Sequence, residues 1–336
     1  MRDPGFWWKQ PGVLARLLWP FAKVYGAIAA SRMDRAGKRI GIPVICVGNF
    51  TLGGTGKTPT ALLIARLLAT DGETPFFLTR GYGGQLAGPI RVDPETHSAD
   101  DVGDEPLLLA REAPCIVARD RAAAAALAEA SGASVIVMDD GLQNPALAKD
   151  LSIAVVDARR GFGDACVFPA GPLRAPLLRQ CAHVQAILMI GEGIGASQAA
   201  ELAGARQIKL LRGRLEPSAD AITAIAGRRL LAFAGIGDPE KFFSTLTASG
   251  NKPAVAESFP DHHPYSEEDA ARLLSRCASD DLTPVTTEKD LARLAGAEGA
   301  RRKLAETAIA IPVTLMVEDM DCLRAMLRET LARRSG

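Results

Sequence analysis

An excess of charge of either sign is absent from this sequence. Its 336 residues include 39 lysines and arginines against 39 aspartates and glutamates, so the formal net charge is zero. Proteins that bind nucleic acid through their overall electrostatic field carry a broad excess of basic residues. We therefore expect no nucleic-acid partner, and charge effects must come from a few local groups. The length is sufficient for two domains, each with its own core.

Paired cysteines are also missing. The six cysteines lie at positions 46, 115, 166, 181, 277 and 322, and no two of them form a CxxC pair. Several lie within apolar runs, as Cys46 does in the sequence Val44-Ile-Cys46. This spacing argues against a disulfide framework and against a zinc site. It indicates reduced, mostly buried thiols in a cytoplasmic setting.

Long apolar runs without charge do not occur at the N-terminus, although all three tryptophans fall within the first twenty residues. Arg16 and Lys23 interrupt the apolar segment, so we expect no window of about 18 uncharged residues that could span a bilayer. The cations interspersed with its aromatic residues are Arg2, Lys9, Arg16, Lys23 and Arg32. The pattern predicts an amphipathic helix in residues 1–33 that lies in the membrane interface.

Two alternatives remain for this N-terminal segment. An aromatic helix could instead pack on the protein's own core. A signal peptide is the other alternative, because Ala27-Ile-Ala29 resembles a cleavage site, but Arg16 and Lys23 break the apolar centre that a signal needs.

Strand-like and helix-like runs alternate after residue 33. Strands are expected at 43–48, 74–79, 115–118, 134–138, 153–157 and 186–190, with helices at 60–68, 105–111, 122–131 and 197–202. A second series has strands at 230–234, 254–258, 284–287 and 309–317, with helices at 239–249, 266–278, 291–294 and 320–333. The alternation predicts an α/β fold with parallel sheets. We place a larger domain at 34–222 and a smaller α/β domain at 223–336, joined near the turn-rich stretch 215–228.

A glycine-rich loop directly follows the first predicted strand of the larger domain. Its glycines would let backbone N–H groups approach phosphate oxygens, its lysine would reach the β- and γ-phosphates, and its last threonine would help to hold Mg²⁺. The predicted nucleotide-binding residues are Thr51, Leu52, Gly53, Gly54, Thr55, Gly56, Lys57 and Thr58. The full phosphate-loop pattern has glycine in place of Thr51, so an ordinary glycine-rich turn is the alternative.

Two adjacent acids end another predicted strand. The run Val135-Ile-Val-Met-Asp-Asp140 places Asp139 and Asp140 at the carboxyl end of a strand in the same sheet. Ligands of open parallel sheets bind at this edge, so the acids are candidate Mg²⁺ ligands together with Thr58. The larger domain is therefore predicted to resemble P-loop NTPases. A turn without ligands is the alternative.

Two motifs offer acid–base groups. Asp104 stands at the start of a helical run, where it could accept a hydroxyl proton during phosphoryl transfer or simply cap the helix. His262 and His263 lie in the turn at 259–265, where they are candidates for acid–base work, and a surface turn capped by Asp261 is the alternative. The segment 286–290 differs from the guanine-specificity motif Asn-Lys-x-Asp, so nothing indicates a preference for GTP.

Taken in order, these motifs resemble the tetraacyldisaccharide 4'-kinase family of lipid A biosynthesis in Gram-negative bacteria. The matching stretches are the loop at 48–59, TRGYGG at 79–84, VGDEP at 102–106, DDGLQN at 139–144, 160–174, 235–243, FPDHHPY at 259–265 and TTEKD at 286–290. The resemblance covers nearly the whole chain and includes the aromatic, basic N-terminus. The family's phosphate loop has the same form, so Thr51 is typical of it.

The resemblance implies an ATP-dependent kinase that phosphorylates the 4'-hydroxyl of a tetraacylated glucosamine disaccharide 1-phosphate, giving lipid IVA at the cytoplasmic face of the inner membrane. It implies a catalytic base at Asp104, assisted by His262 across the two domains, with the C-terminal domain closing over the active site. The other implied roles are phosphate binding by Lys57; Mg²⁺ binding by Thr58, Asp139 and Asp140; and substrate or nucleotide contact by Asn49, Tyr82, Arg121, Gln143 and Arg174. No protein partner is implied.

The chain also departs from the family pattern. The family commonly has an acid after the arginine that corresponds to Arg174, where this chain has Ala175, and this puts one metal contact in doubt. Leu142 and Asn144 also differ from the usual DDGFQH sequence. Two other function classes stay open at this point. One is a P-loop ATPase or GTPase that acts as a switch or metallochaperone, and the other is a membrane-docked binding module with a degenerate nucleotide site.

Overall fold

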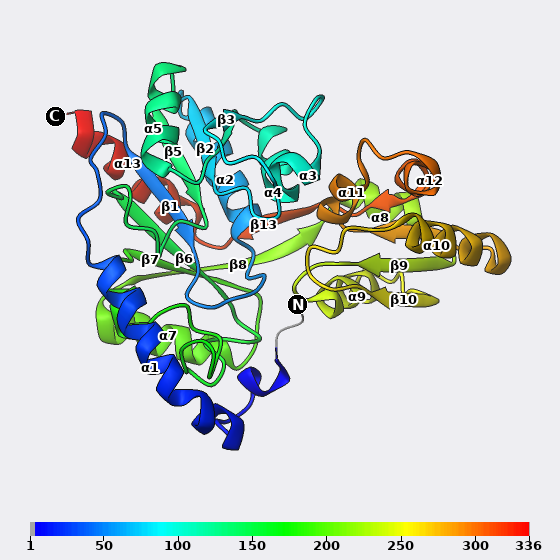
Figure 1. Ribbon diagram of the computed structural model, residues 1–336, viewed down its shortest axis with the longest axis horizontal. Coiled ribbons are helices and arrows are strands. Elements are labelled where there is room, and N and C mark those ends of the chain that lie inside the picture. The colour runs from blue at the N-terminus through cyan, green and yellow to red at the C-terminus, as the bar shows by residue number, and fades with distance from the viewer. Residues whose placement is uncertain (1–3, 336) are drawn as a thin grey trace.

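The computed structural model describes residues 4–335, whose strands form two sheets (Figure 1). The large sheet has nine strands in the spatial order β13 (Val313–Val317), β8 (Lys209–Pro217), β7 (Ala186–Ile190), β6 (Leu151–Asp157), β1 (Val44–Gly48), β5 (Val135–Asp139), β2 (Pro75–Thr79), β4 (Cys115–Val117) and β3 (Ile90–Arg91). Neighbouring strands are parallel except for β13 and β3, which pair antiparallel at the two edges. The predicted α/β fold is confirmed. Arg2 lies outside the described residues.

Helices cover both faces of the large sheet, and this explains why its central strands are apolar throughout. Along β1, Val44 and Cys46 belong to one core cluster, whereas Ile45 and Val47 belong to the other. One face packs against α5 (Arg121–Ala130), α6 (Leu177–Cys181) and α7 (Gly195–Arg206). The other packs against α2 (Lys57–Thr70), α3 (Ala99–Val102), α4 (Asp104–Ala110) and α13 (Met320–Ser335).

The small unit is built around a second parallel sheet with the order β10 (Val255–Ser258), β9 (Leu230–Ala234), β11 (Thr283–Thr286) and β12 (Ile309–Ala310). Its helices are α8 (Ala219–Ile225), α9 (Pro239–Ala248), α10 (Glu267–Asp280), α11 (Glu288–Leu294) and α12 (Gly299–Thr307). Phe233 and Phe242 lie in core clusters on opposite sides of this sheet. Figure 1 shows the small unit beside the large sheet, with β8 leading toward it.

The C-terminal boundary of the predicted smaller domain needs correction. The expected strand at 309–317 is two strands, because β12 belongs to the small sheet whereas β13 pairs with β8 at the edge of the large one. Pro312 separates them, and proline cannot donate a ladder hydrogen bond. Leu315 and Val317 then pack in the core of the large unit together with α13. The range 223–336 therefore includes a C-terminal segment that completes the larger unit.

The N-terminal segment forms η1 (Gly5–Trp8) and the 21-residue helix α1 (Val13–Met33), which lies along the large unit (Figure 1). Only small or C-terminal residues of α1 are buried, namely Ala15, Ala22, Gly26 and Met33. Its exposed large apolar residues are Val13, Leu14, Leu17, Trp19, Phe21, Val24, Tyr25 and Ile28. By length and composition alone the helix is a candidate membrane span, although Arg16 and Lys23 lie within it, so the interfacial position expected from the sequence stays a prediction.

The tryptophans of this segment do not share one environment. Trp7 is buried, and its Nε1 donates to the Pro169 carbonyl at 3.1 Å. Its ring lies 6.0 Å from that of Phe168, whereas Trp19 is 51% exposed. Packing on the protein itself therefore explains Trp7 but not Trp19.

Candidate active site

The glycine-rich loop connects β1 to the N-terminus of α2, as predicted. Gly53 and Gly56 have φ values of 96° and 98°, a left-handed conformation that glycine adopts without strain. A Cβ at Gly56 would meet Cδ1 of Ile190 at 2.6 Å, whereas a Cβ at Gly54 would meet nothing within 4 Å. The loop is therefore packed against the sheet at Gly56 and open at Gly54, so a phosphate group can approach the backbone at Gly54.

A segment just before α6 braces this phosphate loop. The Leu52 N–H donates to the Pro172 carbonyl at 2.8 Å. The Nε of Arg174 donates to the Thr51 carbonyl at 3.0 Å, so the off-pattern residue contributes through its backbone. Because a backbone carbonyl does not depend on residue type, this contact is compatible with threonine in place of glycine.

Asn49 and Gln143 hold the same loop in place through hydrogen bonds to backbone carbonyls. Asn49 is fully buried and donates from Nδ2 to the Gly53 carbonyl at 3.3 Å. Nε2 of Gln143 donates to the Asn49 carbonyl and to Oε1 of Gln180, both at 2.7 Å. These two side chains position the loop, and their contact with substrate stays a prediction.

Asp139 and Asp140 lie at the carboxyl edge of the large sheet, next to the phosphate loop. The register of β1 against β5 pairs Val47 with Asp139. Val47 is followed by Gly48, the last residue of β1, after which the loop begins. Lys57 Nζ lies 3.8 Å from Oδ1 of Asp140, and Arg174 Nη1 lies 3.0 Å from the same oxygen. Burial opposes ionisation of Asp140, but the positive charges of Arg174 and Lys57 lower its pKa to about 2. Asp140 is therefore an anion held between two cations.

Asp139 has no such partners. It is fully buried, and within residues 4–335 neither of its carboxylate oxygens has a hydrogen-bond partner. Burial, together with the Glu105 carboxylate, raises the pKa of Asp139 to about 7. A buried carboxylate without partners is costly unless a cation or a proton compensates it.

The oxygen atoms at this edge fit a Mg²⁺ ion. The unpartnered carboxylate of Asp139 and the buried hydroxyl of Thr58 are the hard oxygen ligands that Mg²⁺ prefers. Within the described residues no group of three or more His, Cys, Asp or Glu side chains could enclose a metal. Phosphate and water oxygens would therefore have to complete the coordination, as is common for Mg²⁺. Ala175, at the position where the family commonly has an acid, is fully buried.

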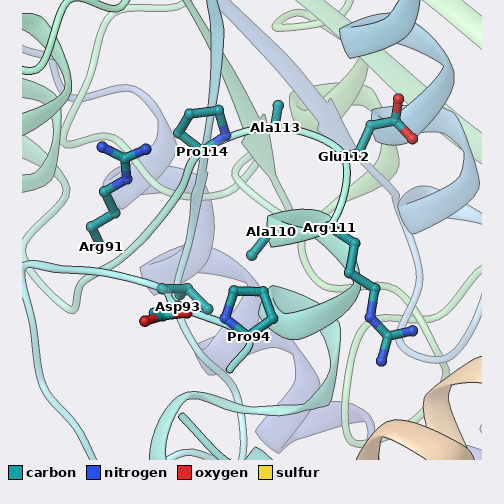
Figure 2. Close-up of a pocket in the computed structure, with 9 residues that line it drawn as sticks. Arg91, Asp93, Pro94, Ala110, Arg111, Glu112, Ala113 and Pro114 are labelled. Atoms are coloured by element: carbon teal, nitrogen blue, oxygen red, sulfur yellow. The ribbon is translucent and has the colours of Figure 1, made fainter. Parts of the chain in front are cut away.

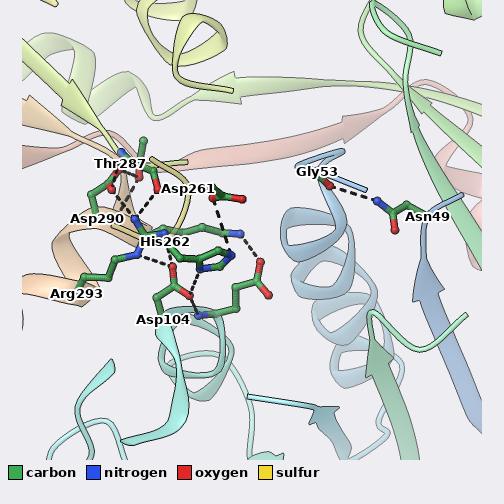
Figure 3. Close-up of polar contacts among 11 residues, drawn as sticks. Asn49, Gly53, Asp104, Asp261, His262, Thr287, Asp290 and Arg293 are labelled. Atoms are coloured by element: carbon green, nitrogen blue, oxygen red, sulfur yellow. Dashed lines mark hydrogen bonds and ion pairs between the residues drawn. The ribbon is translucent and has the colours of Figure 1, made fainter. Parts of the chain in front are cut away.

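Asp104 lies at the junction of the two units (Figure 3). It is 3% exposed, and its Oδ2 accepts hydrogen bonds from Nε and Nη2 of Arg293, with Nε at 2.8 Å. Its Oδ1 accepts from the Glu105 N–H at 3.0 Å and pairs with Nδ1 of His262 at 3.2 Å. The N-cap residue of α4 is Gly103, which has no side chain, and Asp104 is the first residue of the helix, where its Oδ1 accepts one N–H of the first turn.

The predicted acid–base pair, Asp104 of the large unit and His262 of the small unit, is in contact in the structure. Burial would lower the pKa of His262, but the hydrogen bond to Asp104 and the charge of that carboxylate raise it. Burial likewise opposes ionisation of Asp104, but the bond from His262 and the charges of Arg293 and Lys289 hold its pKa well below the usual value. Because an ionised carboxylate only accepts, Nδ1 of His262 must carry the proton that they share. The ring of Tyr82 lies 5.0 Å from the His262 ring.

The small unit also reaches the phosphate loop. A Cβ at Gly237, in the turn between β9 and α9, would lie 3.1 Å from the Gly54 nitrogen and 3.4 Å from Oδ2 of Asp261. Asp261 immediately precedes His262. The turn that carries the histidine and the loop that would carry phosphate therefore flank the same glycine.

Arg121, another predicted contact, is less accessible than expected. Its side chain is buried, and Nη1 donates to the Ala118 carbonyl at 3.1 Å. Burial lowers its pKa to about 10, although the charges of Asp139 and Asp140 act in the opposite direction. Arg121 lies within the field of the two acids, and its contact with a ligand stays a prediction.

Three site residues escaped the sequence reasoning. Lys289, Asp290 and Arg293 all lie in α11 of the small unit, the first two in its first turn and Arg293 in its last. Nζ of Lys289 lies 2.5 Å from Oε1 of Glu105. The segment 286–290 was rejected as a guanine motif and counted among the stretches that resemble the family, but none of its residues was assigned a role. The signal that could have found them is a dense group of charged residues directly after an apolar strand of the second sheet.

A separate cavity of about 510 Å³ lies away from this constellation (Figure 2). It lies between the β3 region and the end of α4, and its lining includes Arg91, Asp93 and Arg111. None of the predicted site residues lines it, and it takes no part in the site described above.

Comparison with known proteins places the chain in a family. The sequence model described as tetraacyldisaccharide-1-P 4'-kinase matches residues 14–332. The tetraacyldisaccharide 4'-kinase of Rhodopseudomonas palustris strain BisA53 is 56% identical over 95% of this chain and 93% of its own length. That of Nitrobacter winogradskyi is 52% identical over 99% and 98%.

Among solved structures, the "apo" form LpxK from Aquifex aeolicus in complex with ATP has the same fold. It superposes with a TM-score of 0.72 at 24% sequence identity, over 95% of this chain and 100% of that one. The matched sequence model and the relatives above half identity extend over nearly the full length of the chain. The chain therefore belongs to the tetraacyldisaccharide-1-P 4'-kinase family.

Proposed function

We propose that this protein is an ATP-dependent kinase that phosphorylates the 4'-hydroxyl of a tetraacylated glucosamine disaccharide 1-phosphate, giving lipid IVA. Membership of the family supports this acceptor. The observation that carries the proposal is that an open phosphate loop lies beside a carboxylate–histidine pair to which both units contribute. Phosphoryl transfer to an alcohol needs both a phosphate cradle and a proton acceptor.

The donor half of the site would hold ATP. The related LpxK that was solved with ATP supports this nucleotide. Lys57 and the open backbone near Gly54 would bind the phosphates, while Thr58, Asp139 and Asp140 would hold Mg²⁺. When bound, Mg²⁺ would neutralise charge on the β- and γ-phosphates.

The acceptor half would handle the proton of the sugar. The 4'-oxygen forms a bond to the γ-phosphorus while the bond from that phosphorus to the bridging oxygen breaks, and ADP leaves with the electron pair. The hydroxyl proton passes to the Asp104–His262 pair. Oδ2 of Asp104 already accepts hydrogen bonds from Arg293. Oδ1, which faces His262, is therefore the oxygen that can share this proton. Because the two groups share a hydrogen bond, protonation of one changes the pKa of the other.

The small unit would close the site against water. Two ion pairs join the units: Lys289 with Glu105 at 2.5 Å, and Lys241 with Asp157 at 3.3 Å. Exclusion of water protects the γ-phosphate from hydrolysis and strengthens electrostatic interactions in the site. We infer that the acceptor sugar enters beside Tyr82, whose side chain is 66% exposed next to His262.

The lipid substrate and α1 together support a location at the cytoplasmic face of the bacterial inner membrane. The helix exposes apolar side chains around Arg16 and Lys23, which suits a peripheral or monotopic contact with anionic lipid. Lys23 Nζ lies 3.7 Å from the centre of the Trp19 ring, a pairing of cation and aromatic group suited to the headgroup region.

The other function classes are not retained. A switch ATPase, GTPase or metallochaperone, and a binding module without turnover, would not account for membership of a kinase family over the full chain. The test is to incubate the detergent-supported protein with γ-labelled ATP, Mg²⁺ and the tetraacyl disaccharide 1-phosphate. We expect labelled lipid. Hydrolysis of ATP without labelled lipid, or binding without turnover, would contradict the proposal.

A further inference from the structure

Arg293 forms hydrogen bonds between the two units that no sequence motif predicted. It is 8% exposed, and it belongs to α11 of the small unit, whereas Asp104 belongs to α4 of the large unit. Two of its guanidinium nitrogens, Nε and Nη2, donate to the same oxygen of Asp104. Its third nitrogen, Nη1, donates to the Gly235 carbonyl and to Oδ1 of Asp290, both at 2.7 Å.

A buried hydrogen-bond network around Asp290 holds the guanidinium of Arg293 in place. Oδ1 of Asp290 also accepts from the Tyr265 hydroxyl at 2.8 Å and from the Gly235 N–H at 2.9 Å. Oδ2 of Asp290 accepts from the Thr287 hydroxyl at 2.6 Å. Figure 3 shows Thr287, Asp290 and Arg293 on one side of Asp104, with His262 on another. Because its carboxylate partner is itself held by three donors, Arg293 has little freedom to turn away from Asp104.

We propose that Arg293 is a positioning residue for phosphoryl transfer: it holds the Asp104 carboxylate so that Oδ1 faces His262, and it does so only while the small unit is docked on the large one. This inference rests on the proposed function for its chemistry. Its geometric basis, an arginine from one unit bound to the acid of the other, stands without it.

The chemical reason lies in how the two oxygens of Asp104 are divided. Arginine binds carboxylates in a planar, strongly directional manner, so its contact with Oδ2 fixes the rotation of the carboxylate. Oδ1 is then left to His262 and the Glu105 N–H. Reactive groups that are displaced by about 1 Å lose about 10²-fold in rate. The docked arginine therefore sets the geometry in which the pair can accept a proton.

Charge is the second contribution of Arg293. The charged groups that face Asp104 are His262 from the 259–265 turn, Arg293 and Lys289 from α11, and Glu105 from its own helix. The positive charge of Arg293 lowers the pKa of both Asp104 and His262. Removal of that charge should therefore raise the pKa of both groups.

Two substitutions separate charge from geometry. Arg293→Gln removes the charge and the paired donors, whereas Arg293→Lys keeps the charge but loses the planar contact. We expect both variants to lower kcat by about 10²-fold, with a smaller change in KM. In Arg293→Gln the acidic limb of the kcat/KM profile should move to higher pH by at least about one unit, and in Arg293→Lys it should stay near that of the wild type.

A matched control removes a different ion pair between the units. Lys241→Gln loses the contact with Asp157 but does not touch Asp104, so its pH profile should match that of the wild type. Circular dichroism and thermal unfolding identify variants that fail to fold. If both Arg293 variants lose activity with an unchanged pH profile, the residue supports the structure only and the inference is overturned.

An NMR titration tests the inference without any turnover. In protein with labelled histidine, the pKa of His262 should rise in Arg293→Gln and stay near the wild-type value in Arg293→Lys. An unchanged His262 pKa in Arg293→Gln would overturn the inference. If the wild-type protein makes no labelled lipid but the titration behaves as expected, the proposed function fails while the positioning role of Arg293 stands.

Discussion

Asp139 and Asp140 are neighbours in the sequence, yet their carboxylates lie in opposite electrostatic surroundings. Asp140 lies between Lys57 and Arg174, whereas within residues 4–335 the oxygens of Asp139 have no hydrogen-bond partner. The difference arises because Asp139 is the last residue of β5, whereas Asp140 has a left-handed backbone with φ of 52°. The two side chains therefore point in different directions.

We expect Asp139→Asn and Asp140→Asn to have opposite effects on stability. Without ligand at pH 8, Asp139→Asn should stabilise the protein by about 1–3 kcal/mol, because it removes a buried charge that lacks partners. Asp140→Asn should destabilise it, because Lys57 and Arg174 lose their anion. Chemical denaturation measures both. With Mg²⁺ and an ATP analogue, the stabilisation by ligand should fall in Asp139→Asn, and an undiminished ligand effect would exclude Asp139 as a metal ligand.

Lys57→Ala and Asp104→Ala should each lower kcat by at least about 10²-fold, since one removes the phosphate-binding cation and the other the proton acceptor. Initial rates of lipid phosphorylation measure the effect. Lys252→Ala, at an exposed lysine of the small unit, serves as the matched control and should retain wild-type rates. A rate within threefold of wild type in either site variant would remove that residue from the proposed roles.

His262 gives a test that depends on pH. Its pKa is raised in the folded protein, so its contribution to stability is fully present below the unfolded pKa of about 6.5 and is lost as pH rises through the folded value. His262→Gln should therefore lower Tm by about 2 °C more at pH 6 than at pH 9. The same variant should lower kcat less than Asp104→Ala does. Equal Tm losses at both pH values, or an unchanged kcat/KM, would contradict the pairing with Asp104.

The exposed face of α1 can be tested without removal of the helix. Leu17, Phe21 and Val24 share one face and are each more than 60% exposed, so their replacement by serine leaves the buried seam intact. We expect this triple variant, like deletion of residues 1–28, to lose most co-sedimentation with anionic vesicles. Met316→Ser removes an exposed apolar side chain elsewhere and should bind vesicles like the wild type. Unchanged binding by the triple variant would refute the interfacial role of this face.

Most of the fold could be predicted from the sequence because its elements have strong local signals. The strands β1, β2, β5 and β7 are short apolar runs buried on both faces, and each was predicted within one residue of its observed bounds. The predictions were weaker where the signal is mixed. β8, the helix α12 and the two-residue strand β3 were not anticipated, because β8 alternates buried and exposed residues and the others are short or mostly exposed.

The division of 309–317 into two strands shows a different limit. Both halves are apolar and strand-like, so the local pattern cannot tell that β12 pairs with β11 while β13 pairs with β8. Which edge a strand joins depends on contacts with residues far away in the sequence. The same reason explains why Lys289 and Arg293 were missed, since their acidic partners lie more than 180 positions away.

The sequence by itself determined the phosphate loop, the acids at the end of β5 and the order of motifs that led to the family. These features are local, because glycine conformations, strand ends and helix starts depend on neighbouring residues. Only the tertiary structure decided that Arg293 binds Asp104, that Asp139 is left without partners and that Trp7 is buried. Those properties arise from the docking of two units and from exclusion of water, and both depend on contacts between distant parts of the chain.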